Sequence, residues 1–169
     1  MSRQVKGFLY GMIGIVLRLH SYLRVSTFKC LKENSKEFVI FPATYYDSGE
    51  ANLSTELNII NARAAGIDNV DIYFSPCVKP STEYELCGNA SGSITKVLNY
   101  LNDNNIKFGK VWLYVTYASD DCENLNGWDK DNKTSNVNLL SNMTRYTVGS
   151  HSYMYSLREM LRLSTKSIG

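Results

Sequence analysis

The stretch that decides the fold is Lys110-Val111-Trp112-Leu113-Tyr114-Val115-Thr116. It follows a segment with the apolar spacing of an amphipathic helix, and we predict that it is a buried strand. Side chains alternate along a strand, so Tyr114 and Thr116 are expected to project from the same face. In a parallel (β/α) barrel that face is the interior, and functional side chains stand at the carboxyl end of such a strand.

The rest of the chain alternates predicted strands and helices, which indicates a parallel sheet. Phe38–Phe41 is a continuous apolar run, as expected for a strand buried on both faces, and Val70–Phe74 follows as the next strand. Lys110–Tyr117 is then the fourth strand and Tyr146–Ser150 a fifth. We predict an α/β fold, an incomplete TIM-like (β/α) barrel of about five βα units, because a complete barrel needs roughly 200 residues or more.

Apolar residues at helical spacing mark the connections between these strands. Ser54 is expected as the N-cap of the helix after the second strand, and Gly66 is expected to end it. The stripe of this helix that faces the core is predicted to be Leu57, Ile60 and Ala64. The helix before the fourth strand carries its apolar stripe on Ile94, Val97, Leu98 and Leu101. A final helix is predicted over Tyr155–Leu163.

The first 24 residues allow two interpretations. Basic residues precede the apolar run Gly7–Leu17, as in a secretory signal peptide, and the run is too short for a stable membrane span. Alternatively, Gly14–Leu19 is the first strand of the barrel. Both interpretations stay open, and residues 25–169 are taken as one domain because no change of composition divides them.

The composition excludes several classes of function. The net charge is only +2 and the basic residues are dispersed, which does not indicate a nucleic-acid-binding protein. The chain has no phosphate loop, no dinucleotide-binding glycine motif and no His-Glu-x-x-His pair. His20 and His151 are isolated and no Cys-x-x-Cys occurs, so we expect neither a metal nor a cofactor.

An ordered set of short motifs gives a more specific indication. From about residue 25 to about residue 160, the chain resembles the invertebrate, nematode-like branch of the chalaropsis-type lysozymes, glycoside hydrolase family 25. The stretches that carry the resemblance are Ser26–Lys32, Phe38–Ile40, Asn61–Ile67, Val70–Tyr73, Ser75–Cys77, Cys87–Ala90 and Val111–Leu113.

The resemblance implies a modified (β/α) barrel that cleaves the muramic acid–glucosamine β-1,4 link in the glycan of bacterial peptidoglycan. It further implies a secreted or lysosomal protein of antibacterial innate defence, which we expect to be a monomer. The partner is therefore expected to be peptidoglycan or a related amino-sugar glycan. The chain is expected to be truncated at its C-terminal end relative to this family.

The carboxylates that the family mechanism requires are missing from this chain. The resemblance places an Asp on the first strand, an Asp-x-Glu on the fourth and a further Asp near the C-terminus. No acidic residue precedes Glu33, and Tyr114 and Thr116 occupy the Asp-x-Glu positions. The last Asp would lie beyond Gly169. Since glycoside hydrolysis needs a carboxylic acid and a second carboxylate, we expect hydrolysis to be lost.

Several side chains of a sugar cleft are nevertheless present. Tyr73 aligns with a tyrosine that lines the family's cleft, with a core aromatic as the alternative interpretation. Tyr45 and Asp47 follow the second strand, and Asp47 is either a ligand contact or a turn residue. Trp112 is interpreted as a packing residue that points away from the Tyr114 side.

An acidic loop after the fourth strand offers substitute carboxylates, namely Asp120, Asp121 and Glu123. The alternative interpretation is that this loop is simply solvated, because a displaced carboxylate must still reach the glycosidic oxygen.

The four cysteines suggest disulfides, since the resemblance implies a secreted protein. Cys77 and Cys87 flank one loop and are the preferred pair. Cys30 and Cys122 either pair with each other or have lost a partner.

Three hypotheses for the function follow. The first is a lysozyme-like protein that binds glycan without cleaving it. The second is an active muramidase that uses displaced carboxylates. The third is a truncated derivative without a stable fold.

Overall fold

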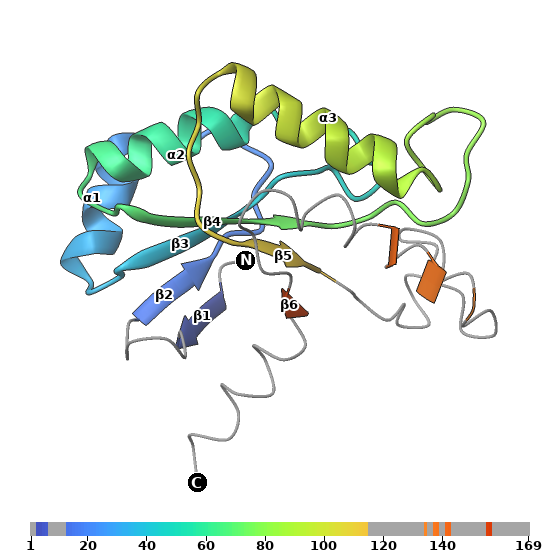
Figure 1. Ribbon diagram of the computed structural model, residues 1–169. Coiled ribbons are helices and arrows are strands. Elements are labelled where there is room, and N and C mark those ends of the chain that lie inside the picture. Colours follow the sequence, from blue (N-terminus) through green and yellow to red (C-terminus); the bar gives the residue numbers. More distant parts are fainter. Residues whose placement is uncertain are drawn as a thin grey trace, which may run out of the picture.

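The computed structural model describes residues 3–6, 13–114, 134, 137–138, 141–142 and 155–156 (Figure 1). Its elements, in chain order, are β1 (Arg3–Lys6), β2 (Ile13–Val16), α1 (Val25–Glu33), β3 (Phe38–Pro42), α2 (Ser54–Ala64), β4 (Asn69–Phe74), α3 (Ala90–Asp103), β5 (Val111–Leu113) and β6 (Tyr155–Ser156).

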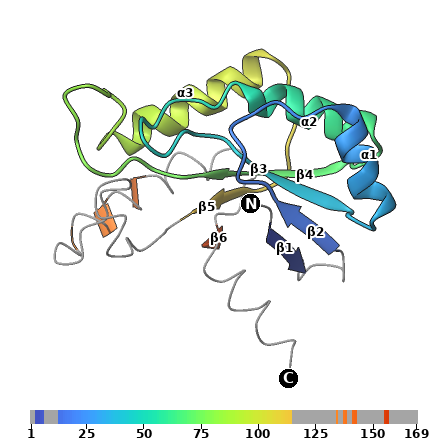
Figure 2. The same cartoon turned by 180° about the vertical axis from the view of Figure 1, so that it is seen from behind.

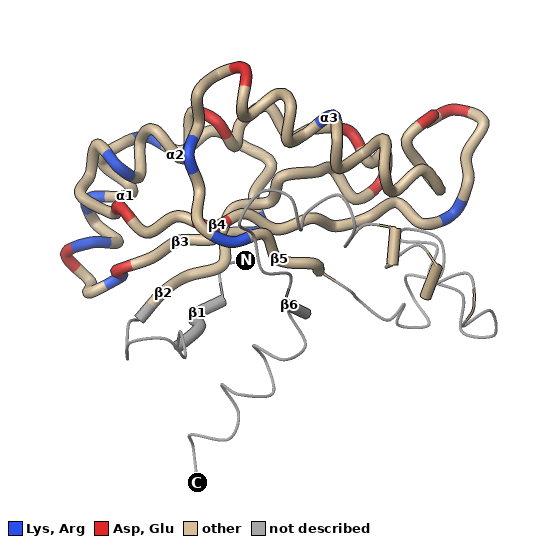
Figure 3. The backbone as a smooth tube through the Cα atoms, in the orientation of Figure 1, with Lys and Arg blue, Asp and Glu red and all other residues tan. Residues whose placement is uncertain are grey.

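The strands form one sheet in the order β1-β2-β3-β4-β5-β6, in which β1 is antiparallel to β2 and all later neighbours are parallel. One helix connects each pair of neighbours from β2 to β5, and α1, α2 and α3 all cover the same face of the sheet (Figures 1 and 2). The predicted alternation of parallel strands and helices is therefore confirmed. Charged residues lie chiefly on the helices and connections, and the strands are mostly uncharged (Figure 3).

Both faces of the sheet are apolar, as expected for parallel strands. The larger cluster joins the helices to the sheet through side chains such as Phe28, Phe41 and Ile72, which are all fully buried. On the opposite face, the smaller cluster consists of Val16, Phe38, Ile40 and Tyr73, with Trp112 and Tyr114 packed against it. The strand residues therefore alternate strictly between the two clusters, as the strand period of two requires.

The three helices end in the same way. After α2, the amide of Gly66 donates to Arg63 O and the amide of Ile67 donates to Ala62 O, which is a Schellman motif. Gly66 has a φ of +84°, so the predicted stop at this glycine is confirmed. After α1 and α3, Ser35 and Asn105 take the same left-handed position, and the chain then enters the next strand.

The predicted stripe of α2 is wrong. Leu57, Ile60 and Ala64 are exposed, and the face that packs on the sheet carries Thr55, Asn58, Ile59 and Ala62 instead. Two polar side chains can be buried there because the backbone satisfies them. Thr55 Oγ1 donates to Pro42 O at 2.6 Å. Asn58 Nδ2 donates to Ser21 O at 3.1 Å, and Asn58 Oδ1 accepts from the amide of Leu23 at 2.8 Å.

The predicted N-cap of α2 is also wrong. Ser54 is the first helical residue, and the side chain of Asn52 accepts hydrogen bonds from Ser54 N at 3.2 Å and Ser54 Oγ at 2.8 Å. Asn52 Nδ2 in turn donates to Pro42 O at 2.9 Å, and Asn52 is only 1% exposed. This buried asparagine therefore links the end of β3 to the start of α2.

The boundaries of other predicted elements differ. The described part of the predicted fourth strand is β5, which covers Val111–Leu113, and its continuation to Tyr117 lies outside the described residues. A final helix from Tyr155 is wrong at its start, because Tyr155–Ser156 pairs with β5 as β6. The predicted strand Tyr146–Ser150 lies outside the described residues.

The N-terminal apolar segment contributes β2 (Ile13–Val16), which pairs with β3 along Gly14–Val16. This is the pairing that the first-strand interpretation expects, whereas removal of a leader stays a prediction. Within the described residues, no helix is both long and apolar enough to cross a membrane.

Candidate functional site

The carboxyl ends of β2, β3, β4 and β5 meet at one edge of the sheet because these strands are parallel. Polar and aromatic residues follow these ends at Arg18, His20, Tyr45, Tyr46, Asp47 and Tyr114. In parallel α/β folds this is the edge where ligands bind, so we call these residues, together with Tyr73, the carboxyl edge.

Two tyrosines and an arginine meet on the face of the sheet opposite the helices. The ring centroids of Tyr73 and Tyr114 are 5.7 Å apart with an interplanar angle of 57°. The guanidinium carbon of Arg18 lies 5.0 Å from the centroid of the Tyr114 ring, which is cation–π geometry. The structure thus joins Tyr73 and Tyr114, which the sequence indicated, to Arg18, which it did not.

Tyr73 is 4% exposed, and burial raises its pKa well above the ordinary value of tyrosine. The positive charge of Arg18 opposes this increase, and Tyr114 adds to it. The Tyr73 hydroxyl therefore stays protonated at neutral pH and does not serve as a base.

Trp112 lies on the same face as Tyr114, contrary to the prediction that it points away from it. Its indole Nε1 donates to Asp71 Oδ2 at 2.8 Å, and the amide of Lys110 donates to Asp71 Oδ1 at 2.7 Å. Residues 112 and 114 share a face because they are two apart on a strand. Trp112 is a packing residue, as predicted, but on the face that carries the site.

Asp71 is the one carboxylate of the described strands on this face, yet it is not placed for catalysis. Burial raises its pKa, and its hydrogen bonds to Lys110 and Trp112 lower it. Both oxygens are occupied, and a Cβ on Gly109 would lie only 2.6 Å from Oδ1. Asp71 also lies in the first half of β4, away from the carboxyl edge, and its contacts tie β4 to β5.

A second aromatic group forms where the chain leaves β2 and β3. The imidazole of His20 lies 5.0 Å from the ring of Tyr45 and 6.1 Å from that of Tyr46. Burial lowers the pKa of His20, and the charge of Asp47 raises it. His20 Nδ1 is buried without a hydrogen-bond partner among the described residues. A buried polar atom of this kind commonly marks a place for a ligand or water.

Arg18 and His20 were not among the site residues predicted from the sequence, because residues 1–24 could be either a leader or the first strand. The signal that could have found them is their position. Both directly follow an apolar run that also satisfies the strand pattern, at the end where parallel strands carry their sites.

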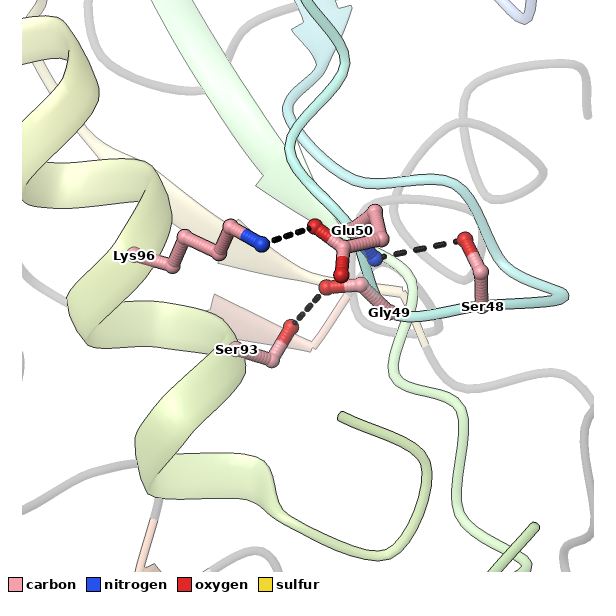
Figure 4. A network of polar contacts seen from close by, with 5 residues as sticks. All are labelled: Ser48, Gly49, Glu50, Ser93 and Lys96. Atoms are coloured by element: carbon pink, nitrogen blue, oxygen red, sulfur yellow. Dashed lines mark hydrogen bonds and ion pairs between the residues drawn. The ribbon is translucent and has the colours of Figure 1, made fainter. Parts of the chain in front are cut away.

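The loop that carries Tyr45 and Asp47 is anchored to α3 (Figure 4). Ser93 Oγ donates to Gly49 O at 2.5 Å, and Lys96 Nζ lies 2.5 Å from Glu50 Oε2. Asp47 lies in the turn that the hydrogen bond from Gly49 N to Tyr45 O closes at 2.9 Å. These contacts hold the second aromatic group in place.

The predicted disulfide between Cys77 and Cys87 is present, with an S–S distance of 2.02 Å. Its sulfur atoms lie 3.5 and 3.4 Å from the carbonyl oxygen of Asp47, so the bridge packs against the turn of the β3–α2 loop. Cys30 is exposed and unbridged among the described residues, and Cys122 lies outside them.

Four predicted site residues, Thr116, Asp120, Asp121 and Glu123, lie outside the described residues. Within the described part of the chain, no group of three or more His, Cys, Asp or Glu side chains is placed to hold a metal ion.

Comparisons with known proteins agree on one family. A family model described as "Lysozyme-like protein 1" matches residues 12–156. "Probable GH family 25 lysozyme 2" of Dictyostelium discoideum is 36% identical over 91 residues, which cover 54% of this chain and 39% of that protein. "Lysozyme-like protein 5" of Caenorhabditis elegans is 29% identical over 150 residues, which cover 86% of this chain and 63% of that protein.

A further relative, "Probable GH family 25 lysozyme 4" of Dictyostelium discoideum, is 29% identical over 134 residues, or 78% of this chain and 55% of that protein. The chain thus spans between 39% and 63% of the length of these three relatives. No solved structure matches the chain.

Proposed function

The chain belongs to the lysozyme-like family of glycoside hydrolase family 25, and from this premise we propose that it binds the glycan of bacterial peptidoglycan without hydrolysing it. The proposal includes a role in antibacterial defence outside the cytosol, in secretions or lysosomes. The Cys77–Cys87 bridge supports such an oxidising compartment.

The single observation that carries the proposal is the position of Arg18 over Tyr114. Glycosidases of this kind pass through an oxocarbenium-like transition state, which carries positive charge and is stabilised by carboxylates. At the carboxyl ends of β2 and β5, this chain presents a guanidinium and a phenol instead. A guanidinium repels the charge that develops in the transition state, so the site favours binding over bond cleavage.

Binding is supported by the aromatic side chains of the carboxyl edge. Tyr46 is 37% exposed, and Tyr45 and Tyr114 are partly exposed. Partly exposed tyrosines offer an apolar ring surface together with a hydroxyl, which suits a sugar with one apolar and one polar side.

The proposal also includes a (β/α) barrel as the complete architecture. Strands β2 to β5 follow each other in sequence order, and their connecting helices lie on one face (Figure 2). This winding is that of a barrel wall, whereas a doubly wound sheet reverses its order and carries helices on both faces.

The test uses the intact, oxidised chain with purified peptidoglycan, and it measures soluble reducing ends and the pelleted fraction in the same tubes. We expect the protein to pellet and to release no reducing ends above a heat-treated control. Tyr114→Ala should reduce the pelleted fraction several-fold, since it removes the ring between Arg18 and Tyr73. Leu57→Ala, on the exposed face of α2, is the matched control and should bind normally.

Release of reducing ends would contradict the proposal and favour an active muramidase. Asp120, Asp121 and Glu123 would then be the carboxylates to replace. Failure of the folded chain to pellet at all would contradict glycan binding itself.

A further inference from the structure

We propose that Arg18 is the recognition point for a carboxylate on the bound sugar, so that the carboxyl edge selects acidic amino-sugar glycans over neutral ones. The inference rests on the proposed glycan binding and names the chemistry of its ligand. It assigns to the end of β2 a role in selecting the ligand.

Arg18 is held against an aromatic ring. Its guanidinium lies over the Tyr114 ring at 5.0 Å from the centroid, while the side chain as a whole is exposed. An arginine that stacks on an aromatic ring keeps its N–H donors in the plane of the guanidinium, where they can form a bidentate pair with a carboxylate. Stacking also restricts the side chain before the ligand arrives, which lowers the entropy lost on binding.

The guanidinium of Arg18 has no opposite charge beside it among the described residues. Among the described residues, Glu50 pairs with Lys96, and no carboxylate forms an ion pair with Arg18. Asp71 shares this face of the sheet, but Lys110 and Trp112 occupy both of its oxygens. Within the described part of the edge, the guanidinium is therefore available to an anion from outside.

The aromatic surroundings of Arg18 fit a sugar better than a bare anion. Tyr73 and Tyr114 form a tilted aromatic pair beside Arg18. Two residues further along the chain, His20 stands against Tyr45 with a buried Nδ1 that has no partner among the described residues. Aromatic rings beside a positive charge suit a sugar ring that carries one carboxylate.

The experiment measures dissociation constants by titration calorimetry with three soluble oligosaccharides. One contains N-acetylmuramic acid, one is a hyaluronan tetrasaccharide that carries glucuronic acid, and one is neutral chitotetraose. We expect the folded, oxidised chain to bind at least one acidic oligosaccharide about tenfold tighter than chitotetraose, as one charge-assisted contact predicts. Selective binding of the muramic acid compound identifies the bacterial wall as the source, and binding of both acidic compounds identifies the carboxylate as sufficient.

Variants separate recognition from a structural role. Arg18→Met keeps the length of the side chain and should abolish the preference for acidic ligands, because it removes the N–H donors that pair with a carboxylate. Arg18→Lys keeps the charge but not the planar fork and should retain only part of the preference. Lys29→Met removes an exposed positive charge on α1 and is the matched control, expected to bind all ligands normally.

Equal affinity for acidic and neutral oligosaccharides would overturn the inference and leave glycan binding intact. Weaker binding of all three ligands by Arg18→Met would also overturn it, because the arginine would then only support Tyr114. If the unaltered chain bound none of the three, the proposed glycan binding would fail together with the inference.

Discussion

At the scale of single residues, the site depends on β2, a strand that either belongs to the mature protein or is removed with a leader. Gly14 of β2 is paired in register with Phe38 of β3, and a Cβ on Gly14 would lie 2.1 Å from the Phe38 ring. Only glycine allows this ring to lie across β2. Arg18 and His20 follow the same strand, so their position depends on this contact.

We expect Gly14→Ala to destabilise the protein by about 1–3 kcal/mol, the usual cost of overpacking a filled site. Urea denaturation would measure the loss. Adding Phe38→Leu should recover part of it, because the two residues share one contact and their effects are coupled. Gly66→Ala is a useful comparison, since a Cβ there meets nothing within 4 Å and only the positive φ opposes it, at a cost of about 1 kcal/mol.

A mature protein that lacks Gly14 would show no effect of the substitution at all. Mass spectrometry of the secreted chain shows directly whether residues 1–24 are retained. Loss of residues 1–24 would identify this segment as a leader, and Arg18 would then not belong to the site of the mature protein.

At the scale of elements, the sequence predicted the type and order of the helices and strands better than it predicted which face of a helix is buried. Apolar runs correctly marked β3, β4 and β5, and the glycine stop of α2 was correct. The buried face of α2 was not predictable, because Thr55 and Asn58 are buried through hydrogen bonds to Pro42 and to residues 21 and 23, far away in sequence. Composition and periodicity carry no information about such partners.

The orientation of α2 leads to a direct prediction. Ile59→Ala should cost about 2–5 kcal/mol, since Ile59 is fully buried in the larger cluster. Leu57→Gln should change stability by less than about 0.5 kcal/mol, since Leu57 is 45% exposed. The urea midpoints of the two variants would show which face of α2 is packed against the sheet. A larger loss of stability for Leu57→Gln than for Ile59→Ala would instead favour the buried face of α2 that the apolar spacing alone predicts.

The carboxyl edge shows the same division between what the sequence contains and what only the fold reveals. Tyr73 and Tyr114 were named from the sequence because each aligns with a cleft position of the family that the chain resembles, and the structure brings their rings together. A role for Arg18 could be inferred only from the structure, in which β2 pairs with β3 and the guanidinium lies over the Tyr114 ring. The contact spans almost 100 residues of sequence, and no local pattern encodes it.

At the scale of the whole molecule, the question is whether this chain has a stable fold at all. One continuous apolar cluster includes residues of β2, β3, β4 and β5 and of all three helices. The opposite face of the sheet is buried too, with Ile40 fully buried and Tyr73 4% exposed. A shared core of this kind couples its elements, because the loss of one exposes the apolar surface of its neighbours.

We therefore expect the intact, oxidised chain to unfold in one cooperative thermal transition, with coincident loss of the near-ultraviolet and far-ultraviolet circular dichroism. Ile59→Ala should lower the midpoint of both signals equally, because Ile59 belongs to the shared core. A gradual loss of signal, with binding of a hydrophobic dye before heating, would instead describe a collapsed chain with loose packing. That result would favour a chain without a stable fold, in which Arg18 and Tyr114 are not held together. A single sharp transition would show that the parallel strands and helices of this chain are sufficient to hold the carboxyl edge together.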